Sequence, residues 1–112
     1  MIIINTKAYR KGVGDELEQL VKTCTDAVDS DNLIFSVQPE DLLRLEDEDI
    51  EVFAQHIDSV EPGSHTGSIL AEGVKEAGAS GTLINHSENR LEKEKIEACV
   101  EKAKSLGLTT VV

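Results

Sequence analysis

The stretch LINHSENR, Leu83–Arg90, joins a strand-like run to a charged helical pattern. The apolar run ends at Ile84, and polar residues that include His86 and Glu88 follow at once. A histidine at the start of a helix lies against the partial positive charge of the helix N-terminus, which disfavours a protonated ring. The stretch therefore predicts a strand followed by a helix. His86 either caps the turn or is a neutral imidazole that can donate a hydrogen bond to a carbonyl.

The same order of strand and helix recurs over the 112 residues. Short apolar or β-branched runs predict strands, and apolar residues spaced three and four apart predict helices. The expected strands are Ile2–Asn5, Asn32–Gln38, Glu51–His56, Gly81–Asn85 and Thr109–Val112. The expected helices are Asp15–Asp29, a short one at Glu40–Glu46 begun by Pro39, one from Ile69 that ends near Gly78, and Ile96–Leu106 capped by Gly107. This alternation, without a linker, predicts one α/β domain over residues 1–112 with parallel strands.

The charge balance excludes several classes of partner. Twenty-two acidic residues against 11 basic ones give a net charge of −11. Such a charge repels phosphate backbones and anionic lipids, so we expect neither a nucleic-acid nor a membrane partner. No apolar run approaches the roughly 20 residues of a membrane span, and Met1–Ile4 lacks the basic start of a signal peptide. These features favour a cytoplasmic protein.

The cysteines and histidines do not form a metal-binding pattern. Cys24 and Cys99 lie far apart on apolar helical stripes, where we expect buried, reduced thiols. His56 is expected to be a hydrogen-bonded structural residue, and His65 is expected to be exposed in a loop with glycine and proline. No P-loop or dinucleotide-binding motif occurs, so we expect neither a metal nor a cofactor.

Polar side chains follow four of the expected strands. They are Asn5 with Lys7, Gln38, Gln55 with His56, and Asn85 with His86. Parallel strands bring their C-terminal ends to one edge, where α/β folds bind ligands. Lys7 could neutralise a substrate anion there or be an ordinary surface lysine. Asn5 could hold the Lys7 ammonium or a substrate oxygen. Glu88 could pair with Lys7, and a paired carboxylate stays ionised and transfers protons poorly.

Four motifs at these positions give the chain a resemblance to triosephosphate isomerase, most closely the compact archaeal type. The motifs are Asn5-Thr6-Lys7, Ala54-Gln55-His56, Glu61-Pro62-Gly63-Ser64-His65-Thr66-Gly67 and Gly81–Arg90. They follow one another in the family's order, each at the expected strand end. The resemblance covers essentially the whole chain and implies the first half of a (β/α)8 barrel, an incomplete TIM barrel of about four βα units.

The resemblance also implies an activity and roles for individual residues. The family interconverts dihydroxyacetone phosphate and glyceraldehyde 3-phosphate through an enediolate, in glycolysis and gluconeogenesis. By resemblance, His86 would polarise the substrate carbonyl, and this family is itself the standing example of a histidine kept neutral by a helix start. Lys7 would supply positive charge, Asn5 would help to place substrate and lysine, and Glu88 would pair with Lys7. Thr66 would reach a neighbouring subunit and steady its Asn5 and Lys7.

The chain departs from the family's pattern in length. The family's glutamate base and its phosphate-gripping loops lie beyond the corresponding segment. A well-placed base contributes about 10²–10⁴ in rate, so we expect the chain alone to be nearly inactive. A half barrel also leaves unpaired edge strands, so a homo-oligomer or a complementary C-terminal half is the expected partner. The end in mid-strand at Val112 favours a fragment or a split product.

Two other interpretations stay open from the sequence. One is a non-catalytic half-barrel binding or assembly module. The other is a small flavodoxin-like open sheet, which has the same alternation of strands and helices. Strand order separates a half barrel from a flavodoxin-like sheet, because only the doubly wound order reverses beside the first strand.

Overall fold

The structure, a computed structural model, describes residues 1–112. Its strands are β1 (Ile2–Asn5), β2 (Leu33–Val37), β3 (Glu51–Ala54), β4 (Gly81–Leu83) and β5 (Thr109–Val111). Its α-helices are α1 (Gly14–Ala27), α2 (Ala71–Glu76) and α3 (Lys93–Ser105). Short 3-10 turns are η1 (Arg10–Gly12), η2 (Ser30–Asn32), η3 (Pro39–Asp41) and η4 (Leu43–Leu45).

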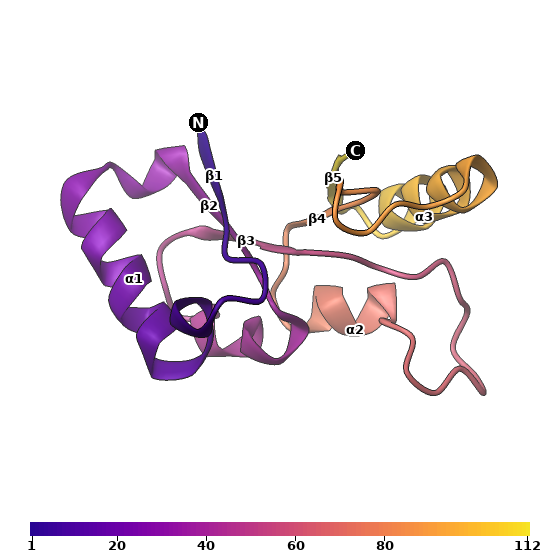
Figure 1. The fold of residues 1–112 in the computed structure, drawn as a ribbon, viewed down its shortest axis with the longest axis horizontal. Helices are drawn as coiled ribbons and strands as arrows, with labels where there is room; N and C mark the ends of the chain where they lie inside the picture. Colours follow the sequence, from indigo (N-terminus) through magenta and orange to yellow (C-terminus); the bar gives the residue numbers. More distant parts are fainter.

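The five strands form one parallel sheet whose order follows the chain, β1-β2-β3-β4-β5. No strand is inserted beside β1, so the doubly wound, flavodoxin-like alternative is wrong. Figure 1 shows α1, α2 and α3 around the outside of the curled strands, with both chain ends on the same open side. The predicted half barrel of parallel βα units is confirmed.

The main core lies between the helices and one face of the sheet. Alternate residues of β2, namely Leu33, Phe35 and Val37, pack there against α1 through Leu17 and Val21. The other helices complete the same cluster, α2 with Ala71 and Val74 and α3 with Cys99 and Ala103. Side chains alternate between the two faces of a strand, so the odd-numbered residues of β2 are buried beneath the helices.

The opposite face of the sheet has its own buried residues, Ile34, Phe53 and Leu83. Strand pairing places Phe53 directly beside Gly81, and Gly81 beside Thr109. A Cβ on Gly81 would lie 2.5 Å from Cζ of Phe53 and 2.6 Å from the Thr109 carbonyl oxygen. The Phe53 ring therefore closes this face of the sheet only because residue 81 has no side chain.

Several predicted boundaries are wrong by a few residues. The segment expected as a helix at Glu40–Glu46 forms η3 and η4 instead. Its buried leucines, Leu42 and Leu45, are three residues apart, which suits the three-residue repeat of a 3-10 turn. Strand β4 ends at Leu83 rather than at the expected Asn85.

The two cysteines differ in burial. Cys99 is 3% exposed, and burial, with the nearby charge of Asp58, raises the pKa of its thiol. Cys24 is only half-buried, so the expectation that both thiols are buried is wrong for this one. Its position on α1 faces the margin of the core, where it packs beside the cluster without being enclosed.

A long loop projects between β3 and α2 (Figure 1). Its base is held by a short parallel bridge between Asp58 and Leu70. Lys102 of α3 forms ion pairs with Glu61 of this loop and with Glu72 of α2. The hydrogen bonds of Lys102 to these carboxylates raise its pKa, and the same contact lowers the pKa of Glu72. Helix α3 therefore fixes the loop to the body of the domain.

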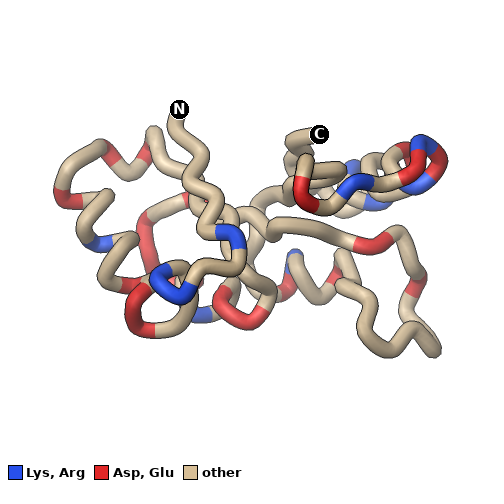
Figure 2. The backbone as a smooth tube through the Cα atoms, viewed as in Figure 1, with Lys and Arg blue, Asp and Glu red and all other residues tan.

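Acidic residues are spread along the helices and loops, and basic residues lie at scattered positions between them (Figure 2). None of the helices has the length and apolar character needed to cross a membrane.

Candidate active site

The C-terminal ends of the strands surround a cleft of about 300 Å³. Its lining comes from all of the first four strand ends, as the sequence predicts for parallel strands. The polar side chains of this strand-end cleft are Asn5, Lys7, Gln38, Gln55, His56, His86, Glu88 and Asn89. A cleft of this size is at the lower end of the range of small-molecule sites.

Lys7 enters the cleft from a left-handed backbone conformation, with φ of 52°. Side chains hold both of its peptide groups. The amide oxygen of Asn5 accepts a hydrogen bond from the Lys7 backbone N–H at 2.9 Å. The amide nitrogens of Gln38 and Gln55 donate to the Lys7 carbonyl oxygen at 2.8 and 2.9 Å. Asn5 thus holds the backbone of Lys7, and the expected contact between Asn5 and the Lys7 ammonium does not form. The other expected role of Asn5, contact with a substrate oxygen, stays a prediction.

The Lys7 ammonium lies 3.1 Å from Oε1 of Glu88. The ion pair expected from the sequence therefore forms, between residues that follow β1 and β4. Glu88 is the only carboxylate in the lining of the strand-end cleft. Because it is already engaged by an ammonium, it is poorly suited to accept a proton from a substrate.

His86 lies in a turn and not at the start of a helix. Helix α3 begins only at Lys93, and the turn is closed by the Asn89 backbone N–H, which donates to the His86 carbonyl at 2.7 Å. The expected contact between His86 and the positive end of a helix is therefore wrong. The sequence suggests it because the charged helical pattern follows closely, but six residues of irregular chain, 87–92, separate His86 from Lys93.

A local hydrogen bond orients the His86 ring instead. The Glu88 backbone N–H donates to Nδ1 of His86 at 3.1 Å. The carboxylate Oε2 of Glu88 is also 3.6 Å from Nδ1, which is too long for a hydrogen bond. A ring nitrogen that accepts a hydrogen bond carries no proton, so the ring proton lies on Nε2. His86 in this form can donate from Nε2 to an acceptor.

Asn85, just before His86, also has a left-handed backbone, with φ of 62°. Its side-chain oxygen accepts a hydrogen bond from the Leu91 backbone N–H at 3.0 Å, which closes the turn that follows β4. Non-glycine residues in this conformation cluster at functional sites. The two such residues of this chain, Lys7 and Asn85, both lie at ends of strands that contribute to the cleft.

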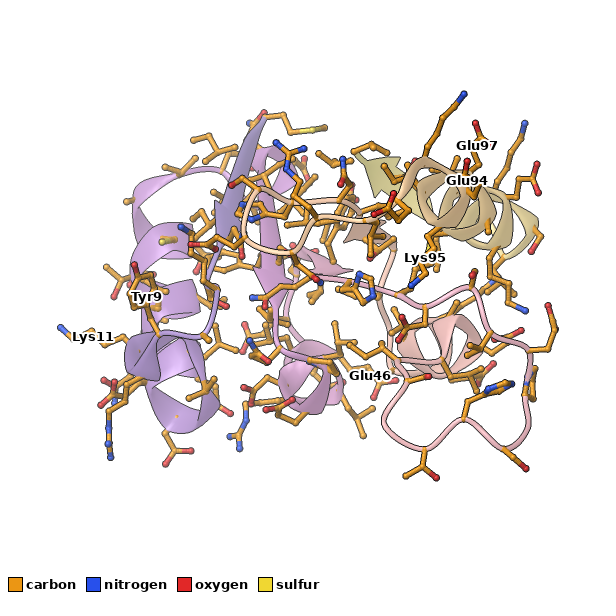
Figure 3. All side chains as sticks on the ribbon, turned by 45° about the vertical axis from the view of Figure 1, so that its right-hand side comes forward. Tyr9, Lys11, Glu46, Glu94, Lys95 and Glu97 are labelled. Atoms are coloured by element: carbon orange, nitrogen blue, oxygen red, sulfur yellow. The ribbon has the colours of Figure 1, made fainter.

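His56, one of the polar residues predicted at the strand ends, also lines the strand-end cleft. Its Nε2 lies 3.1 Å from Oδ1 of Asp58, whose other oxygen accepts the Ile69 backbone N–H at 2.7 Å. Burial opposes ionisation of Asp58, but the hydrogen bonds from Ile69 and His56 outweigh it and lower its pKa. Lys95, whose charge acts in the same direction, extends from α3 toward the middle of the molecule, whereas Glu94 and Glu97 point outward (Figure 3).

The remaining predicted residue, Thr66, lies outside the cleft. It is exposed in the projecting loop between β3 and α2. The sequence predicts Gln38 and Gln55 as polar residues at the ligand-binding edge but gives neither a specific role. Their convergence on Lys7 follows from the pairing of β1, β2 and β3. No three His, Cys, Asp or Glu side chains are grouped so that they could hold a metal ion.

Comparison with known proteins gives one consistent family. The family model for triosephosphate isomerase matches residues 1–112. The chain is 44% identical over 115 aligned positions to a triosephosphate isomerase of Methanocaldococcus jannaschii, covering all of this chain and 52% of the relative. It is 47% identical to that of Methanobacterium bryantii, covering all of this chain and 51% of the relative.

A solved structure agrees with the fold. The crystal structure of triosephosphate isomerase from Bartonella henselae superimposes with a TM-score of 0.82 and 30% sequence identity. The match covers 97% of this chain and 48% of that one. The chain therefore spans about half the length of the curated relatives and of the solved structure that it matches.

Proposed function

Since the chain belongs to the triosephosphate isomerase family, we propose that it forms the half of an isomerase active site that polarises and holds the substrate. The reaction interconverts dihydroxyacetone phosphate and glyceraldehyde 3-phosphate by proton transfer through an enediolate. The observation that carries the proposal is the shared cleft, in which His86 from the end of β4 and Lys7 from the end of β1 line one space.

In this proposal His86 is the electrophile. Its Nε2 proton donates to the substrate carbonyl oxygen, while the Glu88 backbone N–H holds Nδ1 at 3.1 Å. A hydrogen bond that strengthens as negative charge develops on the carbonyl oxygen stabilises the enediolate more than the ground state. The ring stays in place during this step because the turn from His86 to Asn89 is closed by its own backbone hydrogen bond.

Lys7 provides the positive charge for an anionic substrate on a chain with net charge −11. The ammonium is held by Glu88, and Asn5 supports the backbone from which it extends. In a strongly acidic protein such a local cation is needed to attract a phosphate ester. Lys7 and Asn5 are thus the proposed substrate-binding residues, and Glu88 is a supporting one.

The catalytic base comes from outside the strand-end cleft in this proposal. Glu88 is the single carboxylate of the lining and is paired with Lys7. A complementary C-terminal half barrel would supply the base, and a homo-oligomer would bring Thr66 of the projecting loop to the Asn5 and Lys7 of a neighbouring copy. The chain by itself is then nearly inactive. The proposed location is the cytoplasm.

The test is complementation. The chain is mixed with a separately produced C-terminal half barrel of an archaeal relative, and isomerisation is followed in a coupled assay. We expect activity from the mixture, and a loss of at least about 100-fold with His86→Gln, as is typical when one oxyanion-stabilising donor is removed. Lys22→Gln, at an exposed position of α1 away from the strand-end cleft, is the control. Full activity of the folded His86→Gln mixture would refute the role of His86.

A non-catalytic assembly module is the second candidate, and the edge strands favour it. Ile2 and Ile3 of β1 and Val111 of β5 are exposed, and unpaired edge strands promote association. The two candidates differ in ligand binding. Binding of phosphoglycolate, an enediolate mimic, that is lost with Lys7→Met supports the enzyme half, whereas a discrete oligomer that binds no phosphoglycolate supports the module.

A further inference from the structure

The left-handed backbone of Lys7 needs a structural cause. Residues with a Cβ rarely adopt a φ of 52° and keep it only where their surroundings hold it. The hydrogen bond from the Lys7 backbone N–H to Asn5 spans two residues, and local bonds of this kind form in many turns. The contacts that distinguish this site are therefore those to the Lys7 carbonyl oxygen.

Gln38 makes the shorter of the two contacts to that carbonyl. Its amide nitrogen lies 2.8 Å from the Lys7 oxygen and 3.0 Å from Oε1 of Gln55. A primary amide has two N–H groups, so each proton of Gln38 has one partner. The Gln55 amide nitrogen, in contrast, lies within 3.2 Å of three acceptors, the Lys7 carbonyl, Oγ1 of Thr6 and the Ser36 carbonyl. Its hydrogen bond to Lys7 is shared, whereas that of Gln38 is not.

Gln38 also orders its partner. By donating to Oε1 of Gln55, it fixes which end of the Gln55 amide faces Lys7. The two glutamines follow β2 and β3, so the chain that leaves β1 is tied to the ends of both neighbouring strands. The direction of the Lys7 Cα–Cβ bond depends on φ, and this direction sets where the ammonium points.

We propose that Gln38 is a positioning residue for ligand binding by Lys7. Its amide holds the Lys7 carbonyl, keeps the left-handed turn, and so directs the ammonium into the strand-end cleft toward Glu88 and His86. The role in binding rests on the proposed function of Lys7. The hold on the Lys7 backbone does not depend on that function.

The first experiment measures the backbone of Lys7 directly in Gln38→Leu, which keeps the size of the side chain and removes both donors. A residue with positive φ gives a strong intraresidue NOE between its amide and α protons. We expect this NOE to weaken for Lys7 in the isotopically labelled Gln38→Leu chain. Asn85 is the internal reference, because its φ of 62° is supported by the turn after β4 and not by Gln38. Gln19→Leu, at an exposed position of α1, is the matched control and should change neither NOE.

The second experiment titrates the same three chains with phosphoglycolate and follows the shifts of Lys7 and His86. We expect Kd to rise about three- to tenfold in Gln38→Leu, as for the loss of one hydrogen bond, and to stay unchanged in Gln19→Leu. A folded Gln38→Leu chain that keeps both the strong Lys7 NOE and the wild-type Kd overturns the proposal. If wild type does not bind phosphoglycolate, the proposed function fails, and the NOE alone decides whether Gln38 positions Lys7.

A third measurement needs no variant and covers the case in which Gln38→Leu does not fold. In the wild-type chain, the Gln38 side-chain amide protons should exchange slowly and show an NOE to the Gln55 side chain. Rapidly exchanging Gln38 amide protons without that contact would overturn the proposal.

Discussion

The ammonium nitrogen of Lys7 lies 3.1 Å from Oε1 of Glu88, 81 positions later in the chain. The pair joins the end of β1 to the turn after β4, and both residues line the strand-end cleft. Its side chains are 38% and 59% exposed, so water and salt screen their attraction. The pair therefore directs the ammonium more than it stabilises the fold.

Removal of this ion pair should have a small effect on stability. In a double-mutant cycle of Lys7→Met and Glu88→Gln, we expect a coupling of about 0.2–1 kcal/mol that decreases as salt is raised. Urea unfolding at two salt concentrations measures it. A coupling above about 2 kcal/mol that does not depend on salt would mean that the pair is a structural element of the fold.

Gly81→Ala should destabilise the domain strongly. The new methyl group would lie about 2.5–2.6 Å from Phe53 and the Thr109 carbonyl oxygen, and overpacking of this kind costs about 1–3 kcal/mol. Gly73→Ala is the control, because a Cβ there has its nearest neighbour at 4.0 Å in helix α2 and should be neutral or stabilising by about 0.5–1 kcal/mol. Thermal unfolding compares them, and equal effects of the two substitutions would contradict the packing of Phe53 on Gly81.

The carboxylate of Asp41 should stabilise the first turn of α1, although the two are 27 positions apart in the sequence. It is 4% exposed, and both of its oxygens accept from the Gly14 backbone N–H, at 3.1 and 3.2 Å. Asp41→Ala should lower the free energy of unfolding by about 1–2 kcal/mol, the usual effect of losing a helix cap. The control is Asp15→Ala, whose side chain is 92% exposed. The cap is not needed if urea unfolding shows the two variants to be equally stable.

The stability of the domain should depend on the ionisation of Asp58. Its pKa in the folded chain is lowered below the ordinary value of 3.8. This contribution is therefore fully present above about pH 3.8 and is lost as the pH falls through the lower, native pKa. We expect Asp58→Asn to be less stable than wild type at neutral pH. The difference in the free energy of unfolding between the two proteins should narrow below about pH 3.8.

Unfolding curves of wild type and Asp58→Asn, recorded from pH 7 to pH 2.5, measure how the difference in their free energies of unfolding changes with pH. Asp31→Asn, an exposed carboxylate whose side chain accepts no hydrogen bond within the chain, controls for the loss of one negative charge. A difference between Asp58→Asn and wild type that stays constant over the whole range would show that ionisation of Asp58 does not support the loop.

The alternation of elements could be predicted because periodicity is a local property. Leu17 and Val21 reveal the buried side of α1 from their spacing alone. The boundary of α3 could not be predicted in the same way. Charged residues before Lys93 fit a helix as well as they fit an exposed turn, and the hydrogen bonds of Asn85 and His86 decide between the two.

The candidate site was predicted in part for a similar reason. Lys7 and His86 follow strands that are recognisable locally, and parallel pairing brings strand ends to one edge. The sequence places His56 among the polar strand-end residues and predicts a hydrogen-bonded structural role for it. In the structure, His56 lines the same cleft and contacts Asp58. Its partner Asp58 is two residues away. This short spacing between a histidine and an aspartate is the feature of the sequence that could have indicated the pair.

The sequence by itself determined the order of the five strands and three α-helices and which polar residues stand at the strand ends, because both depend on neighbours along the chain. Only the tertiary structure decided that Gln38 and Gln55 meet on the Lys7 carbonyl, that Asp41 caps Gly14, and that Phe53 covers Gly81. Such contacts depend on the order and register of the paired strands. These are set by burial of the whole sheet against its helices, and no local pattern encodes them.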